Sequence, residues 1–515
     1  MSEPRQQPGQ ALATPTPSPK LSPAATYGPM SLRQANLAML ALTMSLFVAA
    51  LSNLVVLTAM PRIAGELGAS QAAYSWIVTA SMLTITITMP IWGRISDLFD
   101  KKRLMQGSVA GYVLFSMCAG LSHSAWLIVA CRAGIGVCAA GIIILIQTIS
   151  VEILPPRERA KWVGYRSLIM AVATLGAPTL GGLLTDNLGW RSCFFIGVPV
   201  AVVSIALVQR LLRLERPVWK AVRIDYEGAA LLSLGITAVM LWVTVTGPAQ
   251  GWFAPISLAL LAVSLALLAA AAYVEHRAVM PILPVDLLLR RDVLMCVLAG
   301  IGTGVAFFGS AVFLAQYLQL GRGLTPTQAG LMAIPEAGAT VVTSLLVSRY
   351  IARSGRYRLP LVAGALLISG GYAVMALIGS TTSLVQIAAG VAMIGAGLGI
   401  VSENLVLVVQ TLVARDLAGT AGAAVAFFRT LGGVFCVAFM GVVLSHQVDA
   451  SVREAGFPPL AGKVPELARL APALRHAIEQ GYVSGSALVY LACTLPTLLI
   501  LACMLLLPER TLDEH

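Results

Sequence analysis

Charged residues are scarce in this chain of 515 residues: Asp, Glu, Lys and Arg together make up 11%, whereas apolar residues make up 58%. A soluble globular domain carries about 25% charged residues, and a chain of this size needs a polar surface to stay in water. The composition therefore excludes a soluble enzyme and a soluble nucleic-acid-binding protein. The net charge of +11 must be located along the chain before it is interpreted.

Cysteine and histidine are also few, with eight and five residues. Every cysteine falls in or beside an apolar run, and no C-x-x-C pair occurs. The sequence therefore predicts no disulfide framework, no metal site and no bound cofactor. It also lacks clustered catalytic side chains and a glycine-rich phosphate loop, which argues against a membrane enzyme and against ATP as the energy source.

Long intervals without charge follow a polar, proline-rich start. About 20 mostly apolar residues cross the roughly 30 Å hydrocarbon layer, and charged residues mark the ends of such segments. Counting on this basis predicts an all-α integral membrane protein with 14 transmembrane helices, arranged as six, two and six. The middle pair is a hairpin, because the charge-free interval from Glu227 to Glu275 is broken by the turn sequence GPAQGW at 247–252.

These spans divide the chain into two six-helix bundles with a hairpin between them. The predicted segments are a disordered cytoplasmic tail at 1–32, an N-terminal bundle at 33–215, a hairpin with flanking segments at 216–290, a C-terminal bundle at 291–507 and a cytoplasmic tail at 508–515. Residues 446–483 are expected to form an external loop with a short amphipathic helix, because Leu467, Leu470, Leu474 and Ile478 recur at helical spacing. A simple cap on the last two spans is the alternative.

The basic residues predict the orientation. If the N-terminus lies inside, 25 of the 34 Lys and Arg residues fall in cytoplasmic segments and seven fall outside. Cytoplasmic loops carry this excess, so both termini are predicted to be cytoplasmic in a multi-pass protein of the plasma membrane, the inner membrane of a bacterium. The positive charge then indicates topology and contact with anionic lipid, and no nucleic-acid partner.

The loop after the second span contains a recognisable motif. GRISDLFDKKR, with Gly93, Asp97, Lys102 and Arg103, resembles the signature cytoplasmic loop of the major facilitator superfamily, G-x-x-x-D-x-x-G-x-R-R. SRYIARSGRYR, at 348–358, resembles a degenerate second copy. The resemblance implies a gating role for Asp97 at a cytoplasmic helix junction. The alternative for Asp97 is that its charge only helps to set the membrane topology. For Lys102 and Arg103 this topology role is the favoured interpretation.

Further motifs resemble the 14-span drug:proton antiporter branch of this superfamily, the Qac and Emr type. CRAGIGVCAAG is similar to R-x-x-Q-G-x-G and keeps Arg132, while LGAPTLGGLL is similar to G-P-x-x-G-G and keeps Pro178, Gly181 and Gly182. Stretches at 316–335 and 419–433 also look like this branch, so that the resemblance covers roughly residues 32–510. It implies the major facilitator fold and export of amphipathic or lipophilic small molecules in exchange for protons.

The chain departs from the family pattern in its first span. Members usually carry an acidic residue there, in L-D-x-T-I-V-N-x-A-L-P, but the matching stretch is LSNLVVLTAMP, with Ser52 in place of the Asp. In the later motifs Ile135 stands for Gln and Ala177 for Gly. The proton site that the family usually has in this span is therefore missing.

Four charges lie well inside predicted spans: Arg132, Glu336, Glu403 and Arg429. A charge at the bilayer centre costs about 2.5–3.5 kcal/mol or more, and apolar burial disfavours the charged form of a carboxylic acid, so that a buried glutamate can exchange a proton near neutral pH. We predict proton coupling through Glu403, in GAGLGIVSENL, then Glu336, in AIPEAG, with Arg132 controlling a nearby proton site. A neutral glutamic acid bonded between helices and an arginine that bridges carbonyl groups are the structural alternatives.

The substrate cannot be read from the residues. Candidates for the walls of a central cavity are Trp76, Phe307, Tyr317, Asn404 and Arg429, although Arg429 is favoured for a structural role. The expected partners are a small molecule and the lipid bilayer, for a monomer with or without a periplasmic adaptor. An exporter or facilitator of another small solute, such as an amino-acid-like compound or a secondary metabolite, with weak or no proton coupling, remains open. A membrane sensor would need a sizeable soluble domain, which the tails are too short to supply.

Overall fold

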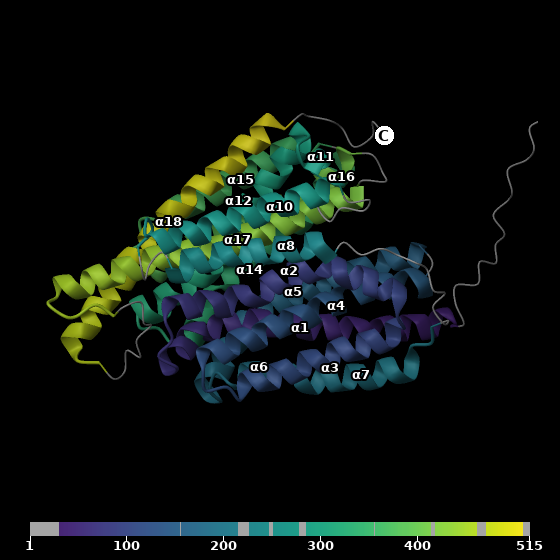
Figure 1. Ribbon diagram of the computed structural model, residues 1–515, viewed down its shortest axis with the longest axis horizontal. Coiled ribbons are helices and arrows are strands. Elements are labelled where there is room, and N and C mark those ends of the chain that lie inside the picture. The colour runs from purple at the N-terminus through teal and green to yellow at the C-terminus, as the bar shows by residue number, and fades with distance from the viewer. Residues whose placement is uncertain are drawn as a thin grey trace, which may run out of the picture.

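The computed structural model describes residues 30–154, 156–214, 226–246, 251–277, 285–354, 356–413, 418–460 and 470–507. Within these ranges all regular structure is helical, and eleven helical segments are long and apolar enough to cross a membrane. The helices lie lengthwise beside one another, as Figure 1 shows. The predicted all-α fold is therefore confirmed.

The N-terminal half contains α1 (Leu32–Glu66), α2 (Gln71–Leu98), α3 (Lys101–Gly120), α4 (Ala125–Ile153), α5 (Pro156–Asn187), α6 (Ser192–Phe195) and α7 (Val198–Leu211). The hairpin contains α8 (Tyr226–Leu241), the π-helical turn η1 (Trp242–Thr246) and α10 (Pro255–Arg277), and α11 (Val285–Leu288) follows it. The C-terminal half contains α12 (Arg291–Gln316), η2 (Tyr317–Gly321), α13 (Pro326–Met332), α14 (Ile334–Ser354), α15 (Arg358–Met375), α16 (Leu384–Thr411), α17 (Ala418–Glu454) and α18 (Pro472–Leu506).

Polar residues between the apolar runs begin several of these helices. Ser31 and Gln34 form a capping box at α1, and Thr325 and Gln328 form another at α13. At α3 the side chain of Asp100 accepts hydrogen bonds from two backbone N–H groups of the first turn. Such caps satisfy donors that have no partner inside the helix, which is a strict requirement where a helix end approaches lipid.

The two halves repeat one packing pattern. In the N-terminal half α1 packs on α5 and α7, α2 on α4, and α3 on α4 and α7. In the C-terminal half α12 packs on α17 and α18, α14 on α16, and α15 on α16 and α18. These contacts correspond helix by helix when each half is numbered from one to six, with α6 and α7 taken together as the sixth helix and α13 and α14 as the second of the C-terminal half. The fold is thus two structurally repeated bundles, an arrangement common in secondary transporters.

Two symmetry-related seams join the halves. Helix α2 packs on α17, and α5 packs on α13 and α14. In the first seam the hydroxyl of Ser75 on α2 donates to the Val437 carbonyl on α17 over 3.3 Å. In addition to the seams, the Gln319 amide on η2 donates to the Thr58 carbonyl on α1 over 2.8 Å. These contacts lie toward the end of the bundle that the basic residues predict to be external, called here the predicted outer end.

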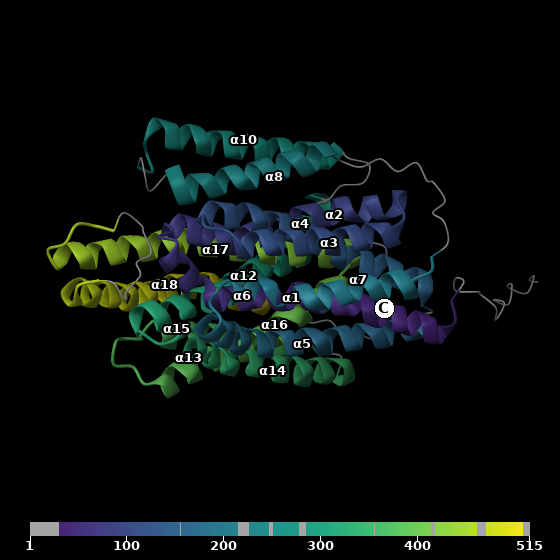
Figure 2. The same ribbon diagram turned by 90° about the horizontal axis from the view of Figure 1, so that it is seen from below.

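The hairpin lies outside the two bundles, along one edge of the molecule (Figure 2). It contacts α2 and α17 through α8 and η1, where buried Met240 and Val243 form an apolar cluster with Trp76, Val434 and Ala438. The hairpin therefore covers the line along which α2 of one half meets α17 of the other.

The segment at 446–483 differs from the expected loop with a separate amphipathic helix. Helix α17 continues to Glu454, and α18 begins at Pro472. The apolar spacing marks the buried side of the first turns of α18, where Ile478 is fully buried, because that side packs on the extended end of α17. Both helices extend beyond the rest of the bundle (Figure 1). Leu467 lies outside the described residues.

Candidate functional site

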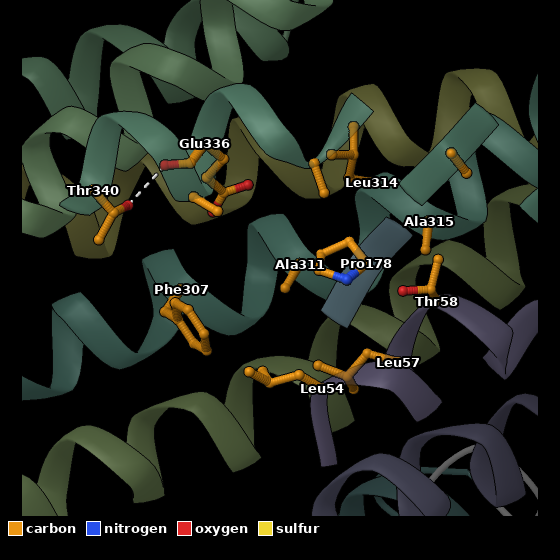
Figure 3. A pocket seen from close by; sticks show the side chains of 13 residues that line it. Leu54, Leu57, Thr58, Pro178, Phe307, Ala311, Leu314, Ala315, Glu336 and Thr340 are labelled. Carbon is orange, nitrogen blue, oxygen red and sulfur yellow. Dashed lines mark hydrogen bonds between the residues drawn. The ribbon is translucent and has the colours of Figure 1, made fainter. Parts of the chain in front are cut away.

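A partly open cavity of about 90 Å³ lies between the two halves. Helices α1, α5, α12, α13 and α14 line it, and Figure 3 shows their side chains around one space. Its wall is almost entirely apolar: among the described residues, Thr58, Glu336 and Thr340 supply the polar side chains. Such a surface suits a lipophilic molecule that is oriented by few polar contacts.

Glu336 is the carboxylate among the described residues of this wall. It lies in the first turn of α14 and is 8% exposed. The Ser310 hydroxyl on α12 donates to its Oε2 over 2.7 Å. The Thr340 hydroxyl donates to the Glu336 carbonyl over 2.8 Å and to the Gly395 carbonyl over 2.9 Å, which fixes this turn against α16. A single short hydrogen bond leaves the carboxyl group free to bind a proton or a substrate cation.

The predicted cavity residues separate into two groups. Phe307 lines the cavity with Glu336. Trp76 does not, because it packs against the hairpin at the α2–α17 line. Tyr317 is fully buried and donates to the Gly379 carbonyl over 2.9 Å.

The other two predicted cavity residues also connect helices of the C-terminal half. Asn404 donates to the Ile400 carbonyl over 2.8 Å and accepts from the Ser348 hydroxyl over 3.2 Å. Arg429 on α17 donates to the Ser402 hydroxyl on α16 over 2.7 Å. In this conformation the described cavity wall therefore contains Phe307 but not Trp76, Tyr317, Asn404 or Arg429, since these four face neighbouring helices.

Arg132 is a buried cation, 1% exposed, at the centre of the N-terminal half. Its Nε donates to the Ile77 carbonyl over 3.0 Å, and its Nη1 donates to Asn53 Oδ1 over 2.8 Å. The Ser81 hydroxyl donates to the same Asn53 oxygen over 3.3 Å. Among the described residues Nη2 has no partner. A neutral amide, not a carboxylate, is therefore the side chain that holds Arg132.

Ser52, the residue that replaces the family's Asp, is 4% exposed and faces away from the cavity. A Cβ atom at Gly197 would lie 2.7 Å from its Oγ, which places it against the start of α7. The Tyr112 hydroxyl on α3 is another neighbour. Position 52 thus belongs to the polar interior that contains Arg132.

The glycines of the predicted antiporter motif let helices touch. A Cβ atom at Gly181 would come within 2.6 Å of the Val55 carbonyl oxygen on α1, and one at Gly182 would collide with Thr327 of α13. From the opposite side, a Cβ atom at Gly330 of α13 would collide with the carbonyl oxygen of Pro178. Helices α5 and α13, from different halves, are therefore in backbone contact at the predicted outer end.

A carboxylate adds to this closure. Asp186 Oδ2, near the end of α5, accepts from the Thr327 backbone N–H over 2.9 Å and from the Thr327 hydroxyl. Thr327 lies in the first turn of α13, where unpaired N–H groups favour a negative charge.

The loop motif after α2 is described in part. Lys102 donates to the carbonyls of Gln209 and Leu212 at the end of α7, each over 2.8 Å. Arg103 is exposed and lies 3.7 Å from Asp100. Gly93, Asp97 and Glu403 lie in helices α2 and α16, but their side chains are outside the described residues. The structure therefore brings Lys102 to a helix end, and Asp97 and Glu403 remain predictions.

Sequence reasoning missed Asn53, Asp186 and Gly330. Asn53 occupies a variable position of the first-span motif. Its neighbour Ser52 was singled out only because it replaces the family's Asp. Asp186 lies at the end of a span, where a charge looks like a topology signal. An asparagine inside an apolar span, on the same helix face as small residues, was the available signal for Asn53.

Two repeated helical bundles around a central cavity define the architecture of a secondary transporter. The chain belongs to the Major Facilitator Superfamily, whose family model matches residues 42–436. The resemblance to this superfamily that the loop motif indicated is thereby confirmed, and the chain is a multi-pass membrane protein of a transporter family.

Its relatives include proteins named as multidrug transporters. Multidrug transporter protein MdtP of Bacillus subtilis is 24% identical over 85% of this chain and 80% of its own length. Multidrug resistance protein fnx1 of Schizosaccharomyces pombe is 30% identical over 79% of this chain and 77% of its length. The MFS-type transporter Rv1877 of Mycobacterium tuberculosis is 30% identical over 88% of this chain, which spans only 66% of that relative.

Solved structures share the fold. A bacterial homologue of the human lysosomal transporter Spinster, in an inward-facing and unoccupied conformation, has a TM-score of 0.65 at 15% identity and covers 92% of this chain and 98% of its own. A peptide transporter of the POT family in complex with sulfate has a TM-score of 0.62 at 12% identity, with 90% and 94% covered.

Proposed function

We propose that this protein exports amphipathic or lipophilic small molecules, such as drug-like compounds, in exchange for protons. The observation that carries the proposal is Glu336, an ionisable side chain in an otherwise apolar cavity between two repeated bundles. The relatives named as multidrug transporters support the same class of substrate.

The proposed arrangement in the membrane has 14 crossings. Helices α3 and α5 and the α8–η1 segment cross in addition to the eleven apolar segments, and both termini are cytoplasmic. The protein then works as a monomer in the bacterial inner membrane, and the contacts at Gly182, Gly330 and Asp186 close its external side. A periplasmic adaptor is the candidate protein partner.

Alternating access follows from these seams. When α5 separates from α13, and α2 from α17, the cavity opens outward; when they close, it opens inward. A protonated Glu336 is neutral and tolerates apolar surroundings, whereas the deprotonated carboxylate favours a cationic or polar substrate or renewed contact with water. Release of the proton on the inner side therefore biases the cycle toward export.

Arg132 and Glu403 are further members of the proposed coupling system. Arg132 lies at the centre of the N-terminal half, bonded to Asn53, and a change in its hydrogen bonds would move α1 relative to α4. Glu403, on α16, is the second candidate carboxylate. Asp97 keeps its proposed gating role at the inner end of α2.

One observation favours a second candidate function. Arg132 is held by a neutral asparagine, and Ser52 carries no charge. A transporter of another small solute, such as an amino-acid-like compound or secondary metabolite, with weak or no proton coupling, is the alternative that fits this feature.

Transport by the purified full chain in proteoliposomes tests the proposal. A lipophilic cationic dye is the probe, driven by an imposed proton gradient and collapsed by a protonophore. We expect Glu336→Gln to lower gradient-driven transport by about 100-fold, the usual scale for loss of a proton-transfer group, while dye exchange without a gradient continues. Glu275→Gln, at a buried glutamate of the hairpin, is the matched control. Gradient-independent transport by the native chain would support the alternative function.

A further inference from the structure

A buried polar cluster in the C-terminal half lies within electrostatic range of Glu336. It contains Tyr372 of α15, Tyr490 and Cys493 of α18 and Cys436 of α17, all buried. The two thiol sulfur atoms are 3.8 Å apart, and the Tyr372 and Tyr490 ring centres are 5.6 Å apart. None of these four lines the cavity that contains Glu336, although Cys436 and Cys493 line a second cavity among α12, α17 and α18.

The hydroxyl of Tyr490 stands out in this cluster. The Tyr372 hydroxyl donates to the Ala306 carbonyl over 2.6 Å, and Ser310 donates to Glu336. Tyr490 is fully buried, yet among the described residues its hydroxyl has no hydrogen-bond partner. A buried unpaired hydroxyl is unfavourable and needs an explanation, such as a partner that it meets in another state.

Glu336, Tyr490, Tyr317 and Arg322 are successive polar neighbours in the C-terminal half, called here the line. The Tyr490 hydroxyl lies within electrostatic range of both Glu336 and Tyr317. Tyr317 donates to the Gly379 carbonyl over 2.9 Å and accepts from Arg322 Nη1 over 3.2 Å. Arg322 also donates to the Thr382 carbonyl over 2.8 Å, so that the line ends at the loop between α15 and α16.

This line is separate from the cleft between the halves. In the present conformation the α5–α13 and α2–α17 seams are in contact at the predicted outer end. The residues from Arg322 to Tyr490 instead belong to the C-terminal half, where α12 and α15 both pack on α18 and η2 packs on α12 and α18.

We propose that Tyr490 and Tyr317 relay protons between the external surface and Glu336 through the interior of the C-terminal half. The inference rests on the proposed proton coupling at Glu336. A proton from external water binds the Tyr317 oxygen as the Tyr317 hydroxyl turns from the Gly379 carbonyl and passes its own proton to Tyr490, and Tyr490 passes its hydroxyl proton to Glu336, so that no net charge is left on either ring. The transfer requires the Tyr490 hydroxyl to rotate, or water to bridge, between Tyr317 and Glu336.

The charged and titratable neighbours fit this role. Cys436 of α17 and Cys493 of α18 lie near Tyr372, and Cys493 also lies near Tyr490, so Glu336 is the carboxylate among these described neighbours. Arg322 is the cation at the outer end, where its hydrogen bond fixes the Tyr317 oxygen. Tyr490 is thus a positioning and relay residue, whereas Glu336 is the group that the substrate meets.

Tyr490→Phe is the direct test, because it removes the hydroxyl and keeps the ring. Tyr317→Phe tests the outer step. Tyr482→Phe is the matched control, since it makes the same change at a buried tyrosine two turns away on α18, near Asp449. The full chain is reconstituted with a pH-sensitive dye inside the vesicles, and a lipophilic cationic dye serves as substrate. Gradient-driven transport and gradient-free exchange are both measured.

We expect Tyr490→Phe to lower gradient-driven transport by about 10-fold or more, with exchange and substrate affinity within about twofold of the native chain, because exchange needs no net proton movement. Infrared difference spectra after an external pH jump should show slower protonation of Glu336, and Tyr482→Phe should behave as the native chain. Native coupling with an unchanged Tyr490→Phe variant would overturn the relay alone. Absence of a Glu336 signal in the native chain would overturn the coupling and the relay together.

Discussion

Asn53 on α1 accepts a hydrogen bond of 2.8 Å from Nη1 of Arg132 on α4, and both side chains are buried. Asn53 also donates to the Ala49 carbonyl of its own helix over 3.0 Å and accepts from Ser81 on α2. One amide therefore joins three helices of the N-terminal half and shares in solvating a cation that the chain keeps inside the membrane.

Asn53→Ala should destabilise the protein markedly. It leaves Arg132 Nη1 and the Ser81 hydroxyl unpaired, and loss of a hydrogen bond to a charged group costs about 1.5–3 kcal/mol. Thermal unfolding of the purified protein in detergent measures the effect. Asn187→Ala removes a comparable bond to a carbonyl four residues earlier, but at an exposed position, and should leave the unfolding temperature almost unchanged. Equal effects of the two variants would contradict a special role for Asn53.

The sequence predicted the helical class, the family and the two-bundle plan, because span length and charge position are properties of single segments. It also singled out Gly181 and Gly182 through their place in the motif G-P-x-x-G-G. It could not show that Gly182 faces Thr327 of the other half, since that contact depends on how two bundles dock. For the same reason Trp76 was expected in the cavity but packs on the hairpin: apolar spacing does not distinguish a cavity wall from a helix contact.

Gly330→Val should favour a conformation that is open at the predicted outer end. The added side chain would collide with the Pro178 carbonyl that now touches Gly330, and overpacking costs about 1–3 kcal/mol, enough to shift a two-state equilibrium by about tenfold. Labelling of Thr58→Cys, a cavity position, by an impermeant thiol reagent added outside is quantified by peptide mass spectrometry.

Gly176→Val is the control for this experiment. It makes the same substitution on α5, but the nearest atom to an added Cβ is 3.9 Å away. External labelling at position 58 should rise in Gly330→Val and not in Gly176→Val. If both variants label like the parent, closure does not depend on the α5–α13 contact.

Lys102 and Arg103 should differ although they are adjacent bases of one motif. Lys102 binds two carbonyls at the end of α7, and Arg358, at the equivalent start of α15, binds the Leu505 carbonyl near the end of α18 over 2.6 Å. A cation at a helix C-terminus contributes about 0.3–1 kcal/mol. Lys102→Ala should therefore lower the unfolding temperature, and Arg103→Ala should not, since Arg103 is exposed. A larger loss from Arg103→Ala would show that its charge acts through another contact.

Phe307→Ala and Trp76→Ala separate a cavity wall from a helix contact. Phe307 lines the cavity, so its truncation removes apolar contact with the substrate, about 1.5–3 kcal/mol for a buried aromatic side chain, and should raise the apparent KM for a lipophilic dye by roughly 10- to 100-fold. Trp76 of α2 packs against α17 and the hairpin, where truncation of a large side chain costs about 3–5 kcal/mol of folding free energy. Trp76→Ala should lower the unfolding temperature and leave KM unchanged in the protein that remains folded. A rise in KM in Trp76→Ala equal to that in Phe307→Ala would mean that Trp76 meets substrate when the α2–α17 seam opens.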